Sequence, residues 1–176
     1  MSREAAFQVI INMPVQKAWE ILQNLTVPDK YVPGVYKCVM HTQKTKGVGT
    51  SRHVWKKMYG FFPVELDETV VEWNEGSGFK LRLHNGEKDR APLPKSYFVY
   101  KIEPAGSDKT LFTGSMGYTF WGGPIGALID IPFVFPGVKM EIHNVVAAVK
   151  HFYETGTTPT SADLKRLRPE VKYVQR

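Results

Sequence analysis

The stretch that decides the fold is AFQVIINMPVQKAWEILQNLTVPDKYVP, residues 6–33. At its start, Phe7, Val9 and Ile11 alternate with the residues between them, and from Val15 to Leu25 apolar residues recur at helical spacing. A period of two that changes to a period near 3.6 marks a strand that leads into a helix. The rest of the chain has mainly strand periodicity until a second long helix near the C-terminus. The sequence therefore predicts a single sheet with one early and one late helix.

Length and composition are those of one globular domain. The chain has 176 residues, of which 43% are hydrophobic and 23% are charged, and both values are ordinary for a soluble domain. The single cysteine, Cys38, excludes an internal disulfide and fits a reducing compartment. Residues Met1 to Ala5 lack the apolar core of a secretory signal. These features predict a cytoplasmic protein.

The basic charge is concentrated at the C-terminus. Half of the net charge of +6 lies in residues 157–176. We predict no nucleic-acid partner, because the sequence has neither an Arg-rich helix nor an aromatic RNA-binding motif. We predict instead that residues 1–156 form the domain and that residues 157–176 form a basic extension.

The middle of the chain predicts strands at hairpin spacing, after the first strand of residues 7–11. These strands are expected over residues 36–43, 50–61, 64–73, 79–84, 96–102 and 110–120. The long helix is expected from Lys139 to Glu154, with Gly156 as its C-cap. Thr160 and Asp163 have the spacing of a capping box for a short final helix. For the first helix, the expected capping oxygen is that of Asn12.

Residues 121–138 form an unusual apolar segment. Glycines and prolines interrupt it, and Asp130 is its only charged residue. Because of these interruptions the segment is a poor candidate for a membrane span. We predict a short helix near residues 125–131 followed by an extended turn, and we expect residues 122–137 to form the entrance to an internal site.

Three short matches carry a resemblance to a known superfamily. They are MPVQKAW at residues 13–19, GVGTSR at residues 47–52 and VKHFYE at residues 149–154. Over residues 5–154, the chain resembles the START-like or SRPBCC superfamily, which includes the polyketide cyclase/dehydrase-type proteins. The resemblance implies an α+β helix-grip fold, in which a curved seven-stranded antiparallel sheet wraps around the long C-terminal helix. It also implies a deep apolar cavity between the sheet and that helix.

The sequence carries no motif for a cofactor, a metal or a nucleophile. The five histidines are scattered, and none stands in a HExxH, CxxC or facial-triad pattern. Neither a Gly-x-Ser-x-Gly elbow nor a phosphate-binding glycine loop is present. We therefore predict no metal and no cofactor, and no catalytic residue is assigned.

The strand of residues 50–61 leaves one question open. Arg52, Val54 and Met58 lie on one face, and His53 lies on the other with Trp55, Tyr59 and Phe61. Only one face of a strand can point into the interior. A buried arginine needs a partner, and Glu68 on the adjoining strand is the candidate. Such a pair is either structural or an anchor for a ligand.

The predicted ligand-binding residues combine this pair with the apolar wall of the sheet and the long helix. They are Arg52, Val54, Glu68, Leu81, Leu83, Phe98, Tyr100, Phe112, Met116, Tyr118, Phe133, Val146 and Val149. The residues alone do not distinguish a filled core from a hollow one, and the superfamily resemblance favours a hollow one.

We therefore predict a protein that binds or transports a hydrophobic small molecule, either lipid-like or aromatic, in an internal cavity. The alternative is an enzyme of the polyketide cyclase, aromatase or dehydratase kind, which would need acid–base groups in the cavity. Its candidates are Arg52, His53, Glu68 and Tyr100. A transient membrane contact through residues 121–138 and the basic tail is a further expectation.

Overall fold

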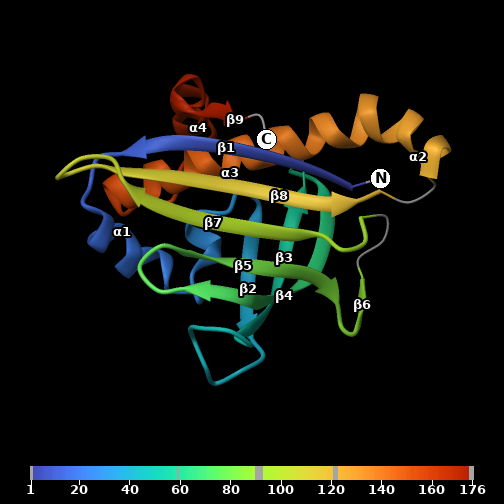
Figure 1. Ribbon diagram of the computed structural model, residues 1–176, viewed down its shortest axis with the longest axis horizontal. Helices are drawn as coiled ribbons and strands as arrows, with labels where there is room; N and C mark the ends of the chain where they lie inside the picture. The colour runs from blue at the N-terminus through green and yellow to red at the C-terminus, as the bar shows by residue number, and fades with distance from the viewer. Residues whose placement is uncertain (1, 59, 90–92, 121–122, 175–176) are drawn as a thin grey trace.

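The computed structural model describes residues 2–58, 60–89, 93–120 and 123–174 (Figure 1). Among these residues, seven consecutive strands separate the early helices from the long helix near the C-terminus. In chain order the elements are β1 (Ser2–Ile11), α1 (Val15–Leu22), η1 (Pro28–Lys30), β2 (Val35–Met40), β3 (Ser51–Met58), β4 (Phe62–Asn74), β5 (Gly78–Asn85), β6 (Lys88–Asp89), β7 (Tyr97–Pro104), β8 (Thr110–Thr119), α2 (Gly123–Ile129), η2 (Asp130–Val134), α3 (Phe135–Thr155), α4 (Ser161–Leu167), η3 (Arg168–Glu170) and β9 (Lys172–Val174).

The described strands form one antiparallel sheet. Its order is β2-β3-β4-β5-β7-β8-β1-β9, and the short β6 pairs with β5. The predicted antiparallel sheet is confirmed, but the described residues form nine strands rather than seven. The two additional strands, β6 and β9, are two and three residues long, which is too short to show an alternating pattern.

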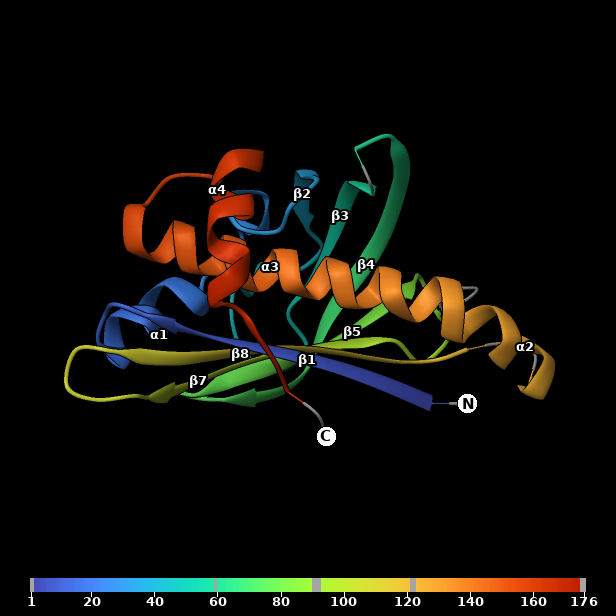
Figure 2. The same ribbon diagram turned by 90° about the horizontal axis from the view of Figure 1, so that it is seen from above.

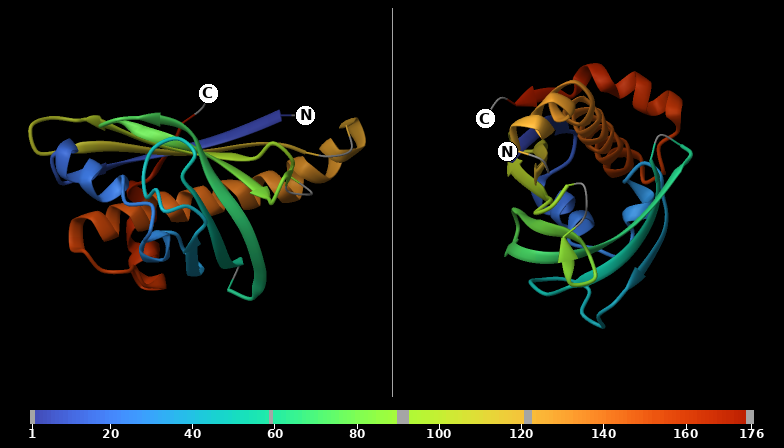
Figure 3. Two further views of the ribbon diagram at one scale, coloured as in Figure 1. Left: turned by 90° about the horizontal axis from the view of Figure 1, so that it is seen from below. Right: turned by 90° about the vertical axis from the view of Figure 1, so that its right-hand side faces the viewer.

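The sheet curves around α3, as the helix-grip prediction requires. Figure 2 shows α3 crossing the sheet, and the right-hand view of Figure 3 shows the strands curling around its axis. The early helix, α1, lies at the end of the sheet where β1 ends. The long helix begins at Phe135, four residues before its predicted start.

The predicted extended turn before α3 is wrong. Residues 130–134 form a π-helical turn, η2, so that α2, η2 and α3 follow one another without a break. Pro132 and Pro136 lie in or next to this turn. A proline removes one helical hydrogen bond and crowds the preceding turn, and a wider π turn accommodates this without ending the helix.

Two of the three predicted caps are confirmed. Gly156 ends α3 in the left-handed conformation, with a φ of 71°. Thr160 and Asp163 form the capping box of α4. The prediction for Asn12 is wrong, because the N-cap position of α1 is Pro14 and no side chain caps it. Asn12 instead donates two hydrogen bonds to the Glu154 carboxylate, from its backbone N–H at 2.7 Å and its side-chain amide at 2.9 Å.

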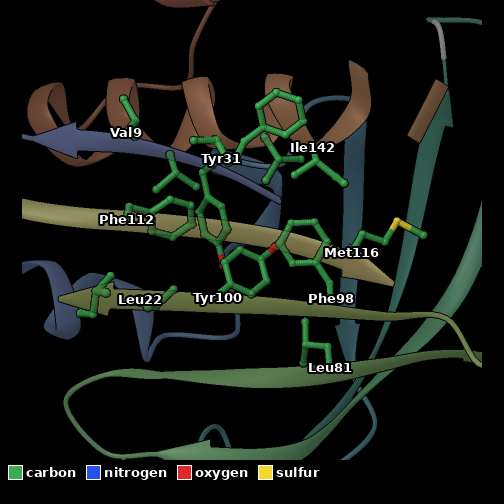
Figure 4. Packing of buried hydrophobic residues seen from close by; sticks show 14 of the residues in the cluster. Val9, Leu22, Tyr31, Leu81, Phe98, Tyr100, Phe112, Met116 and Ile142 are labelled. Carbon is green, nitrogen blue, oxygen red and sulfur yellow. The ribbon is translucent and has the colours of Figure 1, made fainter. Parts of the chain in front are cut away.

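The C-terminal half of α3 is packed tightly against β8. A Cβ atom added to Gly114 would lie only 2.9 Å from a methyl carbon of Val146. Phe112, Val146 and Val149 are fully buried in this region. Figure 4 shows Phe112 on the other side of Tyr100 from Phe98 and Met116. This half of the interior is therefore filled by side chains.

Residues 157–174 pack against the rest of the domain. Leu167 and Val171 are buried within the main hydrophobic cluster, and β9 pairs with β1. Residues of the predicted basic extension thus contribute to the common core.

Candidate functional site

A cavity of about 310 Å³ lies between the N-terminal half of α3 and the sheet. Most of its walls are apolar side chains from β3, β4, β5, β7, β8 and α3, and a few polar residues interrupt them. The lining consists of Val32, Val35, Val54, Lys56, Met58, Val64, Leu66, Glu68, Leu83, Leu93, Phe98, Tyr100, Met116, Phe133, Val134, Gly137, Val138, Glu141 and Val145. This volume is at the small end of the range for pockets that bind small molecules.

Seven of the thirteen predicted site residues line this cavity. They are Val54, Glu68, Leu83, Phe98, Tyr100, Met116 and Phe133. Figure 4 shows Phe98, Tyr100 and Met116 side by side beneath α3. Arg52, Leu81, Phe112, Tyr118, Val146 and Val149 are buried but do not line it.

The residues outside the lining are engaged elsewhere. Phe112 packs against Tyr153 of α3, with ring centroids 6.5 Å apart. Val146 packs closely against Gly114. Tyr118 donates a hydrogen bond of 2.6 Å to Asp130. Phe112 and Val146 thus fill the interior beside the C-terminal half of α3, and the cavity lies beside its N-terminal half.

The open question about β3 is decided in favour of the Arg52 face. Arg52 and Val54 are buried, and the intervening His53 lies on the outer face. His53 contacts Asp67 and Glu65 there, so it cannot serve as an acid or base in the cavity. Its prediction as an acid–base candidate is therefore wrong, and the reason is the two-residue period of the strand.

Arg52 and Glu68 form the buried ion pair that the sequence predicts. The Nε atom of Arg52 donates to a carboxylate oxygen of Glu68 at 2.6 Å, and one terminal nitrogen of Arg52 donates to the Leu25 carbonyl. Burial alone lowers the pKa of Arg52, but the neighbouring Glu68 carboxylate raises it, so the guanidinium stays charged. Arg52 lies behind the cavity wall, whereas Glu68 also faces the cavity.

Tyr100 supplies a neutral polar group to the cavity. Burial raises the pKa of its phenol well above the ordinary value, and the nearby hydroxyl of Tyr31 and carboxylate of Glu68 act in the same direction. Tyr100 therefore stays protonated across the physiological range. It can donate a hydrogen bond to a guest but cannot act as a base there.

A second polar pair joins the sheet to the helix at the edge of the cavity. The ammonium group of Lys56 on β3 contacts the carboxylate of Glu141 on α3, and both residues line the cavity. A larger groove of about 820 Å³ lies alongside and also includes Glu141 and Val35. The pair thus stands where the open groove meets the cavity.

The apolar segment before α3 borders the cavity on another side. Phe133, Val134 and Gly137 belong to the cavity lining, and yet the Phe133 side chain is 74% exposed. The buried Asp130 accepts hydrogen bonds from Tyr118 and Arg3. These bonds hold η2 against the strands β1 and β8.

The cavity also uses residues that the sequence analysis missed. Val32 and Val35 come from the turn and strand after α1, Leu93 comes from the loop before β7, and Val138, Glu141 and Val145 lie on α3. On α3, Val138, Glu141 and Val145 follow the three- and four-residue spacing of one helix face. That spacing could have identified them, whereas the loop residues carry no such signal.

None of the helices in the described part of the chain combines the length and hydropathy that a bilayer crossing requires. Among curated protein sequences, none matches this chain significantly.

Solved structures of similar fold include two proteins named as aromatase/cyclases and one named as a synthase. The di-domain ARO/CYC BexL of the BE-7585A biosynthetic pathway superposes with a TM-score of 0.70 at 16% identity. The match covers 89% of this chain and 48% of BexL, so the chain spans about half the length of that protein. The Zhui aromatase/cyclase of Streptomyces sp. R1128 has a TM-score of 0.70 at 10% identity, over 88% of this chain and 94% of its own. Norcoclaurine synthase of Thalictrum flavum has a TM-score of 0.64 at 16% identity, over 88% of this chain and 98% of its own. At these identities the similarity establishes the helix-grip fold alone.

The sequence itself identifies the family. Residues 3–151 match the family described as "Polyketide cyclase / dehydrase and lipid transport", which is the group that the three short motifs indicated. The match extends from β1 into the last turns of α3 and so includes every strand and helix that encloses the cavity. The chain belongs to the polyketide cyclase/dehydrase and lipid transport family.

Proposed function

We propose that this protein binds a hydrophobic small molecule in the cavity between α3 and the strands β3, β4, β5, β7 and β8. The observation that carries the proposal is a cavity of about 310 Å³ with mainly apolar walls. An apolar guest gains about 25 cal/mol for each Å² that it removes from water. Tyr100 and Glu68 supply hydrogen-bonding groups that would orient it.

A fluorescence titration tests this proposal. The neutral probe N-phenyl-1-naphthylamine should bind the intact chain with a saturable rise in emission, at one probe per chain. Val145→Phe places a ring in the cavity and should weaken binding at least tenfold. Val71→Phe, the same substitution at an exposed position on β4, is the matched control and should bind like the native chain. Equal binding by the two variants would contradict the cavity as the binding site.

Native mass spectrometry of the protein as purified offers an independent test of ligand binding. It should show a retained apolar compound, which is absent or reduced in Val145→Phe. The mass of that compound would identify the ligand class directly.

We infer that Phe133 stands at the mouth of the cavity, because it is exposed and yet belongs to the cavity lining. Phe133→Ser should change the rate of probe uptake in stopped-flow experiments. Phe61→Ser removes another exposed phenylalanine, at the turn before β4, and should leave the rate unchanged. Equal rates in all three proteins would exclude Phe133 from the entrance.

An enzyme of the cyclase or dehydratase kind is the second candidate. It is supported by the charged groups Lys56, Glu141 and Glu68 on the cavity wall, since acid–base catalysis needs such groups in an otherwise apolar site. Lys56→Met and Glu141→Gln should then abolish turnover of a polyketide-type substrate while probe binding persists. If the protein is only a binder, no turnover is detected in the native chain.

The exposed apolar segment is the part best suited to touch a membrane. Ile125, Leu128, Ile131 and Phe133 are each more than half exposed. The basic helix α4 follows the other end of α3, about 30 Å away for a helix of 21 residues. We therefore expect Leu128→Ser, rather than removal of the basic tail, to reduce co-sedimentation with anionic liposomes.

A further inference from the structure

Two histidines and an aspartate meet on the outer face of the sheet, away from the cavity. His41 follows β2, His53 lies on β3, and Asp67 lies on β4 directly opposite His53 in the register. One carboxylate oxygen of Asp67 lies 2.9 Å from Nε2 of His41 and 2.7 Å from Nδ1 of His53. These three donor atoms all lie within 4.8 Å of one another.

The carboxylate at the centre is held in place. Its other oxygen accepts a hydrogen bond of 2.7 Å from the backbone N–H of Gly86. The group is thus a fixed oxygen donor that points toward two imidazole nitrogens.

The second ring nitrogen of His53, Nε2, lacks a hydrogen-bond partner among the described residues. It is buried, while a carboxylate oxygen of Glu65 lies 3.6 Å from it. If Nδ1 donates a proton to Asp67 in the neutral ring, Nε2 is a bare acceptor that faces an anion. A cation bound at Nδ1 moves that proton to Nε2, where it points toward Glu65.

A ligating histidine that donates its other N–H to a carboxylate is the usual outer arrangement of protein metal sites. Two imidazoles and one carboxylate are donors that suit Zn²⁺ and other late first-row divalent ions. Zinc bonds of about 2.0 Å separate tetrahedral donors by about 3.3 Å, which is within a small side-chain rotation of the observed contacts.

We propose that His41 Nε2, His53 Nδ1 and Asp67 Oδ1 bind one divalent transition-metal ion, with Zn²⁺ as the favoured ion and water in the fourth position. The ion would join the chain after β2 to β3 and β4 and so fasten the edge of the sheet. This site is separate from the cavity and does not depend on the proposed function. The sequence prediction of no metal site rested on the scattered positions of the histidines, and the strand register brings two of them together.

The test is a Zn²⁺ titration of the tag-free intact chain by calorimetry. We expect one ion per chain, and at least a tenfold loss of affinity in both His53→Gln and Asp67→Asn. His84→Gln is the control, because His84 lies on the neighbouring strand but both of its ring nitrogens already contact protein groups, Thr69 and the Gly86 carbonyl. It should bind Zn²⁺ as the native chain does.

A spectroscopic measurement keeps the test independent of how well the variants fold. Co²⁺ should give the visible absorption of a low-coordinate nitrogen–oxygen site and should quench Trp55, whose ring lies 4.2 Å from that of His53. EDTA should reverse both effects, and Trp55→Phe should remove the quenching. Absence of saturable Zn²⁺ or Co²⁺ binding by the native chain would overturn the proposal, as would unchanged affinity in His53→Gln and Asp67→Asn.

Discussion

At the scale of single residues, one buried ion pair, Arg52–Glu68, allows a charged group to lie in the apolar interior. Arg52 is 2% exposed and is neutralised by Glu68, whose side chain is 14% exposed. An arginine buried to this extent would be very costly without its partner, because few water molecules can reach it. The pair therefore makes the two strands β3 and β4 depend on each other.

Glu68→Gln should destabilise the protein by about 3 kcal/mol, since it leaves a buried charge without a countercharge. Urea unfolding measures this loss. Glu103→Gln breaks the exposed pair with Lys101 and should change the free energy of unfolding by less than about 1 kcal/mol. Similar losses in the two variants would show that the buried pair has no special role.

At the scale of elements, the capping box makes the stability of α4 depend on pH. Hydrogen bonds from the Thr160 hydroxyl and backbone N–H lower the pKa of the Asp163 carboxyl to about 2. A carboxyl whose pKa is lower in the folded state stabilises that state above its ordinary pKa near 4. This contribution is lost as the pH falls from about 4 to 2.

Asp163→Asn should therefore be less stable than the native chain at pH 6, and the two proteins should converge in stability near pH 2. Urea unfolding at a series of pH values checks the convergence, and carboxyl NMR should place the Asp163 midpoint near pH 2. A stability difference that is independent of pH would contradict the assignment.

The approach of α3 to β8 is a second property of the elements. Gly114→Ala would place a methyl group 2.9 Å from Val146, so we expect a loss of about 1–3 kcal/mol from overpacking. Val146→Ala, made in the Gly114→Ala variant, removes this clash. The loss of unfolding free energy caused by Val146→Ala should therefore be smaller in the Gly114→Ala variant than in the native chain. A double-mutant cycle of urea unfolding measures this difference.

At the scale of the whole molecule, the interior is filled beside the C-terminal half of α3 and hollow beside its N-terminal half. Val145 and Val149 lie one helical turn apart on α3 and are both buried, but only Val145 lines the cavity. The same enlargement at the two positions should therefore have different effects on stability.

Val149→Phe should lose about 1–3 kcal/mol because it overpacks a filled region. Val145→Phe should change the free energy of unfolding by less than this, because the cavity has room for the ring. Thermal unfolding of both variants makes the comparison. Equal losses would mean that the cavity closes up in solution.

The sequence determined the features that depend on neighbouring residues. The alternation of Phe7, Val9 and Ile11, the spacing in α3, the αL cap at Gly156 and the Thr160–Asp163 box are all local, because dihedral preferences and capping bonds act over a few residues. The Arg52–Glu68 pair was also predictable, since a buried arginine on one hairpin strand has few partners within reach. The family then followed from short motifs in these local elements.

Only the tertiary structure decided which residues meet across the sheet. The register between β3 and β4 places His53 opposite Asp67, and the close approach at Gly114 fills one side of the interior while the other side stays hollow. These outcomes join residues that are tens of positions apart, and a one-residue shift in register would reverse them. The periodic pattern indicates which side chains face inward, but it does not set how far the helix stands from each strand.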